Sequence, residues 1–170
     1  SLLQYRISLI SNGSNLHKYC DDIINAPFDW IRISLDSSNA HTHSVVHGCS
    51  LNVFKSITDS VKKIAKYKTV GISFLILPNN YKEIYNCAKY VKELNVKYIE
   101  VKPELNFKDR EITQIDDKIK EEIKKQINKI KNELCDDTFS IIYPSSINYS
   151  QMNQEKKYTI CEACYYRTVL

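Results

Sequence analysis

The sequence predicts an α/β protein, and more specifically a partial (β/α) barrel of the TIM-like type with parallel strands, on two observations. Short apolar strands alternate with amphipathic helices along the 170 residues, which favours a parallel sheet with right-handed connections. Three strands are also polar on one face only, clearly at residues 30–36 and 96–102 and more weakly at 5–11. Parallel sheets normally bury aliphatic side chains on both faces, so one-sided polarity favours a barrel with a polar interior over a doubly wound sheet. An edge strand open to solvent is the alternative for any single strand.

The first half of the chain contains two expected strands and two expected connections. Residues 5–11 are expected to form a strand that ends at the Asn12-Gly13-Ser14 turn. Apolar residues at helical spacing predict a short helix around 16–24. After the strand at 30–36, the polar residues 37–50 are expected to form a long loop.

The second half continues the alternation with longer helices. Apolar stripes at helical spacing predict helices, and short β-branched runs that end near proline or at turn residues predict strands. The helices are expected at about 52–66, 81–94 and 113–134, and the strands at 69–77, 96–102 and 139–143. Asn80 with Glu83 fits a capping pattern at the start of the second of these helices.

Charge and hydropathy narrow the class of protein. The net charge is +4, and much of it comes from lysines interleaved with glutamates between residues 118 and 131, as in a solvated helix face. We therefore expect no nucleic-acid partner. No apolar run reaches the roughly 18 residues that span a bilayer, and no secretory signal is visible, so we expect a cytoplasmic protein without a membrane partner.

The six cysteines do not suggest a disulfide framework, and two of them form a close pair. Cys161 and Cys164 fit an iron–sulfur cluster or a zinc site that needs further ligands, or they are unligated. A second group, in the predicted loop, has the side chains of metal ligands. It consists of His41, His43, His47 and Cys49. We interpret this group as part of a polar loop over the barrel interior.

Six segments follow one another in the order of a known family. They are Ile10-Ser11-Asn12-Gly13-Ser14, Trp30-Ile31-Arg32-Ile33-Ser34-Leu35-Asp36, His43 with His47-Gly48 and Phe54, Phe74 to Ile84 with Asn80, Tyr98-Ile99-Glu100-Val101-Lys102-Pro103, and Cys161-Glu162-Ala163-Cys164. The ordered set resembles radical S-adenosylmethionine (SAM) enzymes. The last segment resembles the entry to the auxiliary-cluster region of the SPASM or twitch subgroups.

The resemblance implies a domain division and a missing part. Residues 1–144 would form the core from about the third barrel strand onward, and 145–170 a linker with the start of an auxiliary-cluster region. The three-cysteine CxxxCxxC signature of the family, which holds its SAM-binding [4Fe–4S] cluster, is absent from the sequence. We therefore expect a fragment of a longer enzyme, truncated at both ends and inert alone.

The resemblance also implies a reaction and its cofactors. In this family a reduced [4Fe–4S] cluster cleaves SAM, and the resulting 5′-deoxyadenosyl radical abstracts hydrogen from a substrate, here an unknown peptide or small molecule. The electron donor would be a flavodoxin or ferredoxin, and an auxiliary [4Fe–4S] cluster would lie in the C-terminal region.

The implied site residues fall into three groups. SAM would be bound by Asn12, Ser34, Asp36 and Asn80, the substrate by Glu100 and Lys102, and a metal by Cys161 and Cys164. Structural roles stay open for several of them. Asn12 could only form its turn, Asn80 could only cap a helix, and Glu100 with Lys102 could be a buried ion pair. Arg32 could bind the methionine carboxylate of SAM or, as we favour, pair with Glu100.

Two other classes of function fit part of the pattern. A barrel lyase, aldolase or hydrolase would use Lys102 as a Schiff-base amine, or Asp36 and Glu100 in acid–base roles. A non-catalytic scaffold with a structural zinc would explain the paired cysteines but not the polar face of the strands. Neither catalytic alternative predicts the paired cysteines.

Overall fold

The computed structural model describes residues 6–103, 105–106, 111–112 and 116–143. Its main sheet has five strands that are all parallel, in the order β1-β2-β3-β4-β7. They are β1 (Ile7–Ser11), β2 (Phe28–Ser34), β3 (Val70–Ile76), β4 (Tyr98–Pro103) and β7 (Ser140–Ile142). Each strand therefore pairs with the one that precedes it in this sheet along the chain.

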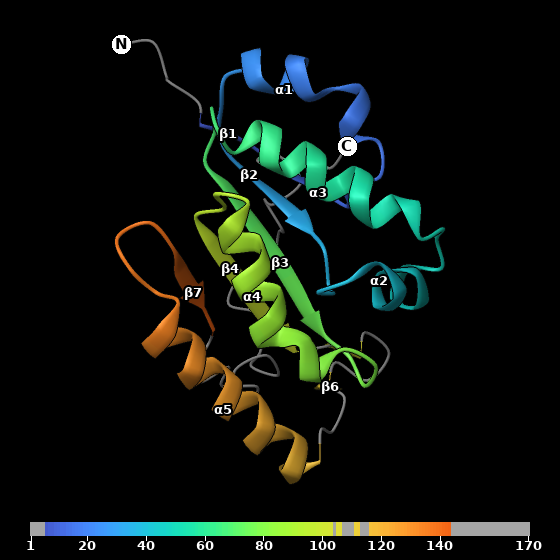
Figure 1. The fold of residues 1–170 in the computed structure, drawn as a ribbon, viewed down its shortest axis with the longest axis vertical. Helices are drawn as coiled ribbons and strands as arrows, with labels where there is room; N and C mark the ends of the chain where they lie inside the picture. Colours follow the sequence, from blue (N-terminus) through green and yellow to red (C-terminus); the bar gives the residue numbers. More distant parts are fainter. Residues whose placement is uncertain (1–5, 104, 107–110, 113–115, 144–170) are drawn as a thin grey trace, which may run out of the picture.

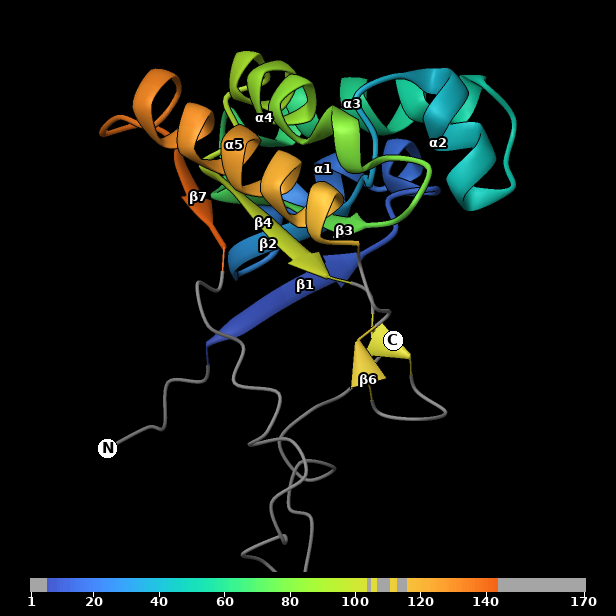
Figure 2. The same ribbon diagram turned by 90° about the horizontal axis from the view of Figure 1, so that it is seen from below.

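The helices connect these strands. They are η1 (Leu16–Lys18), α1 (Cys20–Asn25), α2 (Ala40–His47), α3 (Asn52–Ile64), η2 (Tyr81–Glu83), α4 (Ile84–Glu93) and α5 (Asp117–Glu133). Figures 1 and 2 show that α3, α4 and α5 lie over the same face of the sheet. Right-handed connections that always advance in one direction place their helices on one side, as in a (β/α) barrel. The predicted fold class is therefore confirmed.

The hydrophobic core lies between the sheet and these helices. Its strand side chains alternate with polar ones, and its helical side chains come from the apolar stripes predicted from sequence. The fully buried members include Ile31, Ile33, Ile72, Phe74, Ile99, Val101, Ile57, Val61, Ile84, Val91 and Ile130. Cys20 in α1 and Cys87 in α4 are also buried and belong to this core.

The predicted loop at 37–50 is wrong in one respect, because it contains the helix α2. Asn39 caps the helix by accepting a hydrogen bond from the backbone N–H of Thr42, and Gly48 ends it in the left-handed conformation. Its β-branched, Ser and His residues have modest helix propensity and no apolar stripe, so periodicity does not reveal it.

Two further differences concern local structure. A small antiparallel pair, β5 (Leu105–Asn106) with β6 (Glu111–Ile112), follows β4 and was not predicted. The capping pattern at Asn80 and Glu83 is also wrong, because the Asn80 side chain makes no cap bond to η2. Within the described part of the chain, no helix combines the length and hydropathy that crossing a membrane requires.

Candidate functional site

The face of the sheet opposite the helices carries a group of polar side chains, which we call the polar face. It consists of Arg32, Ser34, Ser73, Glu100 and Lys102. In β2 and β4 these residues alternate with fully buried core residues, so they point away from the helices. The strand register places Ser34 beside Ser73, and Ser73 beside Glu100. The predicted one-sided polarity of these two strands is therefore present, and β3 adds Ser73.

An ion-paired trio occupies the polar face. Glu100 accepts a hydrogen bond from Arg32 and forms an ion pair with Lys102, whose Nζ lies 2.9 Å from the Glu100 carboxylate. Arg32 and Glu100 belong to strands that are separated by β3. Arg32 lies beside Gly71, and Glu100 lies beside Ser73, so small side chains on β3 let the long arginine reach across. The pair we favoured for Arg32 is thus the one the structure contains.

Aromatic rings border the trio. The Arg32 guanidinium lies 5.5 Å from the centre of the Trp30 ring, within the range of a cation–π contact. The Tyr98 ring lies against Gly71, where an added Cβ would come within 2.1 Å of it. Burial raises the pKa of the Tyr98 hydroxyl, an effect that nearby Arg32 partly opposes. The Trp30 ring therefore borders the Arg32 guanidinium, and the Tyr98 ring covers Gly71 on the strand between Arg32 and Glu100.

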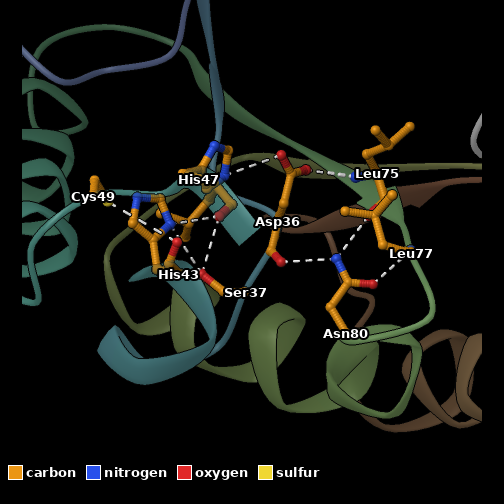
Figure 3. A network of polar contacts seen from close by, with 9 residues as sticks. Asp36, Ser37, His43, His47, Cys49, Leu75, Leu77 and Asn80 are labelled. Atoms are coloured by element: carbon orange, nitrogen blue, oxygen red, sulfur yellow. Dashed lines mark hydrogen bonds and ion pairs between the residues drawn. The ribbon is translucent and has the colours of Figure 1, made fainter. Parts of the chain in front are cut away.

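Asp36 does not continue the polar row of β2, contrary to the expectation from alternation. The strand ends at Ser34, and Asp36 adopts a left-handed conformation with φ of 55°. Its carboxylate is buried, with one oxygen accepting a 2.6 Å hydrogen bond from the Leu75 N–H and the other lying 3.3 Å from His47 Nε2 (Figure 3). Asp36 thus links the end of β2 to β3 and to α2.

Asn80 is almost fully buried, and its side-chain amide binds backbone groups at the end of β2 and at the end of β3. Its Nδ2 donates to the carbonyls of Asp36 and Leu75 at 2.9 and 2.8 Å, and its Oδ1 accepts from the Leu77 N–H at 2.7 Å (Figure 3). Both amide hydrogens are used in these bonds. As a SAM contact Asn80 stays a prediction, and in this structure its amide holds the carboxyl ends of β2 and β3 together.

Asn12 lies in the turn after β1 and is exposed. Its Oδ1 accepts hydrogen bonds from the N–H and the hydroxyl of Ser14 at 3.1 and 2.9 Å. The next residue, Gly13, is buried with φ of 78°. The turn role that we left open is therefore present, while a ligand contact of Asn12 stays a prediction.

Two histidines of α2 pack beside Asp36. His43 Nδ1 lies 2.9 Å from the Leu35 carbonyl, so this nitrogen carries the proton when the ring is neutral. The ring centres of His43 and His47 are 4.4 Å apart. The hydrogen bond to Asp36 raises the pKa of His47, and burial lowers the pKa of His43.

The two shifts have opposite effects on stability. Protonation of His47 favours folding, so its contribution is present below its ordinary pKa of 6.5 and is lost as pH rises through its raised value. Protonation of His43 opposes folding, so its contribution is present above pH 6.5 and is lost as pH falls through its lowered value.

Replacement of Asp36 by Asn is expected to lower the pKa of His47, because the ring loses its anionic partner. Histidine ¹³C–¹H signals followed through a pH titration measure this pKa directly. The loss of unfolding free energy should also be larger below about pH 6.5, where protonated His47 stabilises the fold, than at a pH above its raised pKa. The exposed Asp29→Asn in β2 is the control. An unchanged His47 pKa in the Asp36 variant would contradict the assigned bond.

Glu83 fixes the start of the segment between β2 and α2. Its carboxylate accepts hydrogen bonds from the N–H and hydroxyl of Ser38 and from the side chains of Asn39 and Thr42. Burial disfavours the ionised form of Glu83, but these donors outweigh burial and lower its pKa. Because Glu83 follows the β3 turn, it ties that turn to the helix α2.

The metal ligands implied by the resemblance can be tested against the described residues. Among these residues, no three His, Cys, Asp or Glu side chains come close enough to hold a metal ion. The described cysteines are Cys20, Cys49, Cys87 and Cys135, and all four are free thiols. The described part of the chain therefore does not fit an iron–sulfur cluster. Cys161 and Cys164 lie outside the described residues, as do the linker and auxiliary region predicted for 145–170.

The polar face does fit an organic ligand with acceptor groups. The Nε of Arg32 is buried and has no hydrogen-bond partner among the described residues. Buried donors without partners are rare in folded proteins, and a ligand or ordered water commonly supplies the acceptor. The Ser34 and Ser73 hydroxyls lie at neighbouring, partly exposed positions. Ser73, Trp30 and Tyr98 were missed as site residues, although the alternation of Gly71 and Ser73 with buried residues in β3 was a usable signal.

Comparison with known proteins relates this fold to a solved structure. No protein-family model and no curated protein matches the chain. A crystal structure of archaeal TYW1 matches 75% of this chain and 39% of its own length, with 19% sequence identity and a TM-score of 0.53. The likeness concerns the fold, and it involves less than half of that protein.

Proposed function

We propose that this chain is part of a radical SAM enzyme, in which the polar face holds SAM and substrate. The observation that carries the proposal is the polar face itself, which combines Ser34, Ser73, Glu100 and Lys102 opposite the helices of a parallel barrel-like sheet. The likeness in fold to archaeal TYW1, a radical SAM enzyme, supports it. The ordered motifs in the sequence point the same way.

The residues present divide between binding and support. Ser34 is the proposed hydrogen-bonding partner for the ribose or methionine part of SAM. Asn12 lies at the same end of the sheet, in the turn that follows the neighbouring strand β1. Asp36 and Asn80, proposed as SAM contacts from the resemblance, would act mainly by holding the ends of β2 and β3 in place. When bound and reductively cleaved, SAM would supply the chemistry that abstracts a hydrogen atom from the substrate, and this chain's residues would bind and orient it.

The finer assignments also belong to this proposal. They follow from the resemblance alone. They are a SPASM or twitch subgroup, an auxiliary cluster at Cys161 and Cys164, a flavodoxin or ferredoxin as electron donor, and a peptide or small-molecule substrate. Because the cluster-binding CxxxCxxC is absent from the sequence, we expect no SAM cleavage by this chain alone.

The test is SAM binding to the chain, measured by equilibrium dialysis with labelled SAM. We expect saturable binding that the double variant Ser34→Ala and Ser73→Ala weakens by about tenfold, the effect of losing roughly two neutral hydrogen bonds. The control is Ser56→Ala on the helix-side surface of α3, where affinity should not change. Absence of saturable SAM binding by a folded chain would overturn the proposal, and so would equal affinity of all three proteins.

A further inference from the structure

We infer that the ligand bound beside Lys102 carries an anionic oxygen group, a carboxylate or a phosphate, and that this group belongs to the substrate. The inference rests on the proposed function only in calling this ligand the substrate. The arguments for an anion come from the charges and hydrogen-bond donors of the polar face.

The first argument is a charge imbalance. Arg32 and Lys102 share the single carboxylate of Glu100, so the trio keeps one positive charge. The strand residues that pair directly with the trio carry no charge, and they are Ile10, Gly71, Ser73, Leu75 and Ile142. A bound anion would balance that charge.

The second argument is a surplus of donors. One Glu100 oxygen is shared by both cations: it accepts a hydrogen bond from Arg32 and pairs ionically with Lys102. Lys102 has two further N–H groups, and the buried Nε of Arg32 lacks a partner among the described residues. Carboxylates and phosphates are acceptors without donors when fully ionised, so they match this surplus.

The third argument identifies Lys102 as the contact. Arg32 is fixed by Trp30 and Glu100, and its side chain is 20% exposed. The Lys102 side chain is 38% exposed and lies nearer the carboxyl end of its strand than Glu100. Ligands of parallel barrels bind at that end of the strands. Glu100 therefore acts as a positioning residue that Arg32 holds and that orients the Lys102 amine.

The charge also favours the substrate over SAM. The sulfonium of SAM is itself cationic, so the surplus positive charge disfavours the sulfonium at the position beside Lys102. An anionic substrate group would instead be attracted, and it would occupy the Lys102 end while SAM occupies the Ser34 side.

The test titrates the full chain with sodium acetate and, separately, with inorganic phosphate, and follows the Lys102 amide by ¹⁵N–¹H spectroscopy. We expect saturable shifts with at least one anion, and the stronger one identifies a carboxylate or a phosphate substrate. Lys102→Met should weaken binding by about tenfold, as expected for the loss of one charged hydrogen bond. The exposed Lys97→Met, immediately before β4, should stay within about twofold.

Unfolding of Lys102→Met would also abolish anion binding, so the test includes a second variant that is expected to bind the anion more tightly. Glu100→Gln keeps the side-chain shape and raises the local surplus to two positive charges, so it should tighten anion binding. Equal binding by wild type, Lys102→Met and Glu100→Gln would overturn the inference, as would an absence of saturable shifts. Displacement of the anion by SAM would assign the position to the SAM carboxylate and overturn the substrate assignment. SAM binding without anion binding would refute this inference alone, and anion binding without SAM binding would refute the proposed function alone.

Discussion

Replacement of Asn80 by Ala is expected to lower the free energy of unfolding by about 3 kcal/mol, because it removes three hydrogen bonds from a buried side chain to backbone groups. These groups are the Leu77 N–H and the carbonyls of Asp36 and Leu75. Asn80 itself is 1% exposed, so water cannot replace its amide without a structural change. A loss of this size is a large part of the stability of an ordinary domain. Urea unfolding followed by circular dichroism measures it.

The neighbouring Asn79 provides the control for this change. It is exposed, and Asn79→Ala should change the unfolding free energy by no more than about 0.5 kcal/mol. If the two alanine variants were equally stable, the role of Asn80 in joining the ends of β2 and β3 would be wrong. SAM affinity measured on the Asn80 variant would then decide whether its amide serves a ligand instead.

Gly13→Ala is expected to cost a similar amount, about 3 kcal/mol, for two separate reasons. Its φ of 78° is unfavourable for a residue with a side chain. An added Cβ would also lie 2.9 Å from Cγ2 of Ile33 and 3.1 Å from Cγ2 of Ile57, both in the core. The turn that carries Asn12 would have to shift away from the sheet.

Gly48→Ala separates these two contributions. Gly48 has a similar φ of 61°, but no atom lies within 4 Å of the position of its Cβ. Only the conformational cost remains, about 1 kcal/mol. Thermal or urea unfolding of both variants should therefore show the Gly13 change to be the more destabilising. Equal losses would mean that packing of the turn against Ile33 contributes nothing.

The predictable parts of this protein are those set by local alternation. In β2 and β4, Arg32, Ser34 and Glu100 each lie between two buried aliphatic residues, so the strands, their faces and the proximity of Arg32 to Glu100 could be expected from sequence. The long amphipathic helices were predictable for the same reason, since their buried stripes follow the helical period. The first residue of α5 falls at Asp117 rather than near 113 because Asp116 caps it.

The parts that could not be predicted depend on contacts between distant residues. The left-handed backbone of Asp36 turns its carboxylate to Leu75, which is 39 residues away, and strand periodicity carries no sign of that turn. Glu83 lies three residues after Asn80 and so resembles a helix cap, but its real partners are Ser38, Asn39 and Thr42. The helix α2 has a single buried residue, His43, and therefore lacks the apolar stripe that identifies a helix.

We propose that SAM binds on the face of the sheet opposite the helices. Chemical-shift mapping of the ¹⁵N-labelled chain with SAM locates the bound ligand. We expect shift changes concentrated at Ser34, Ser73 and their strand neighbours, with little change along the outer surfaces of α3 and α5. Changes confined to the helical side of the sheet, or no changes at millimolar SAM, would contradict it.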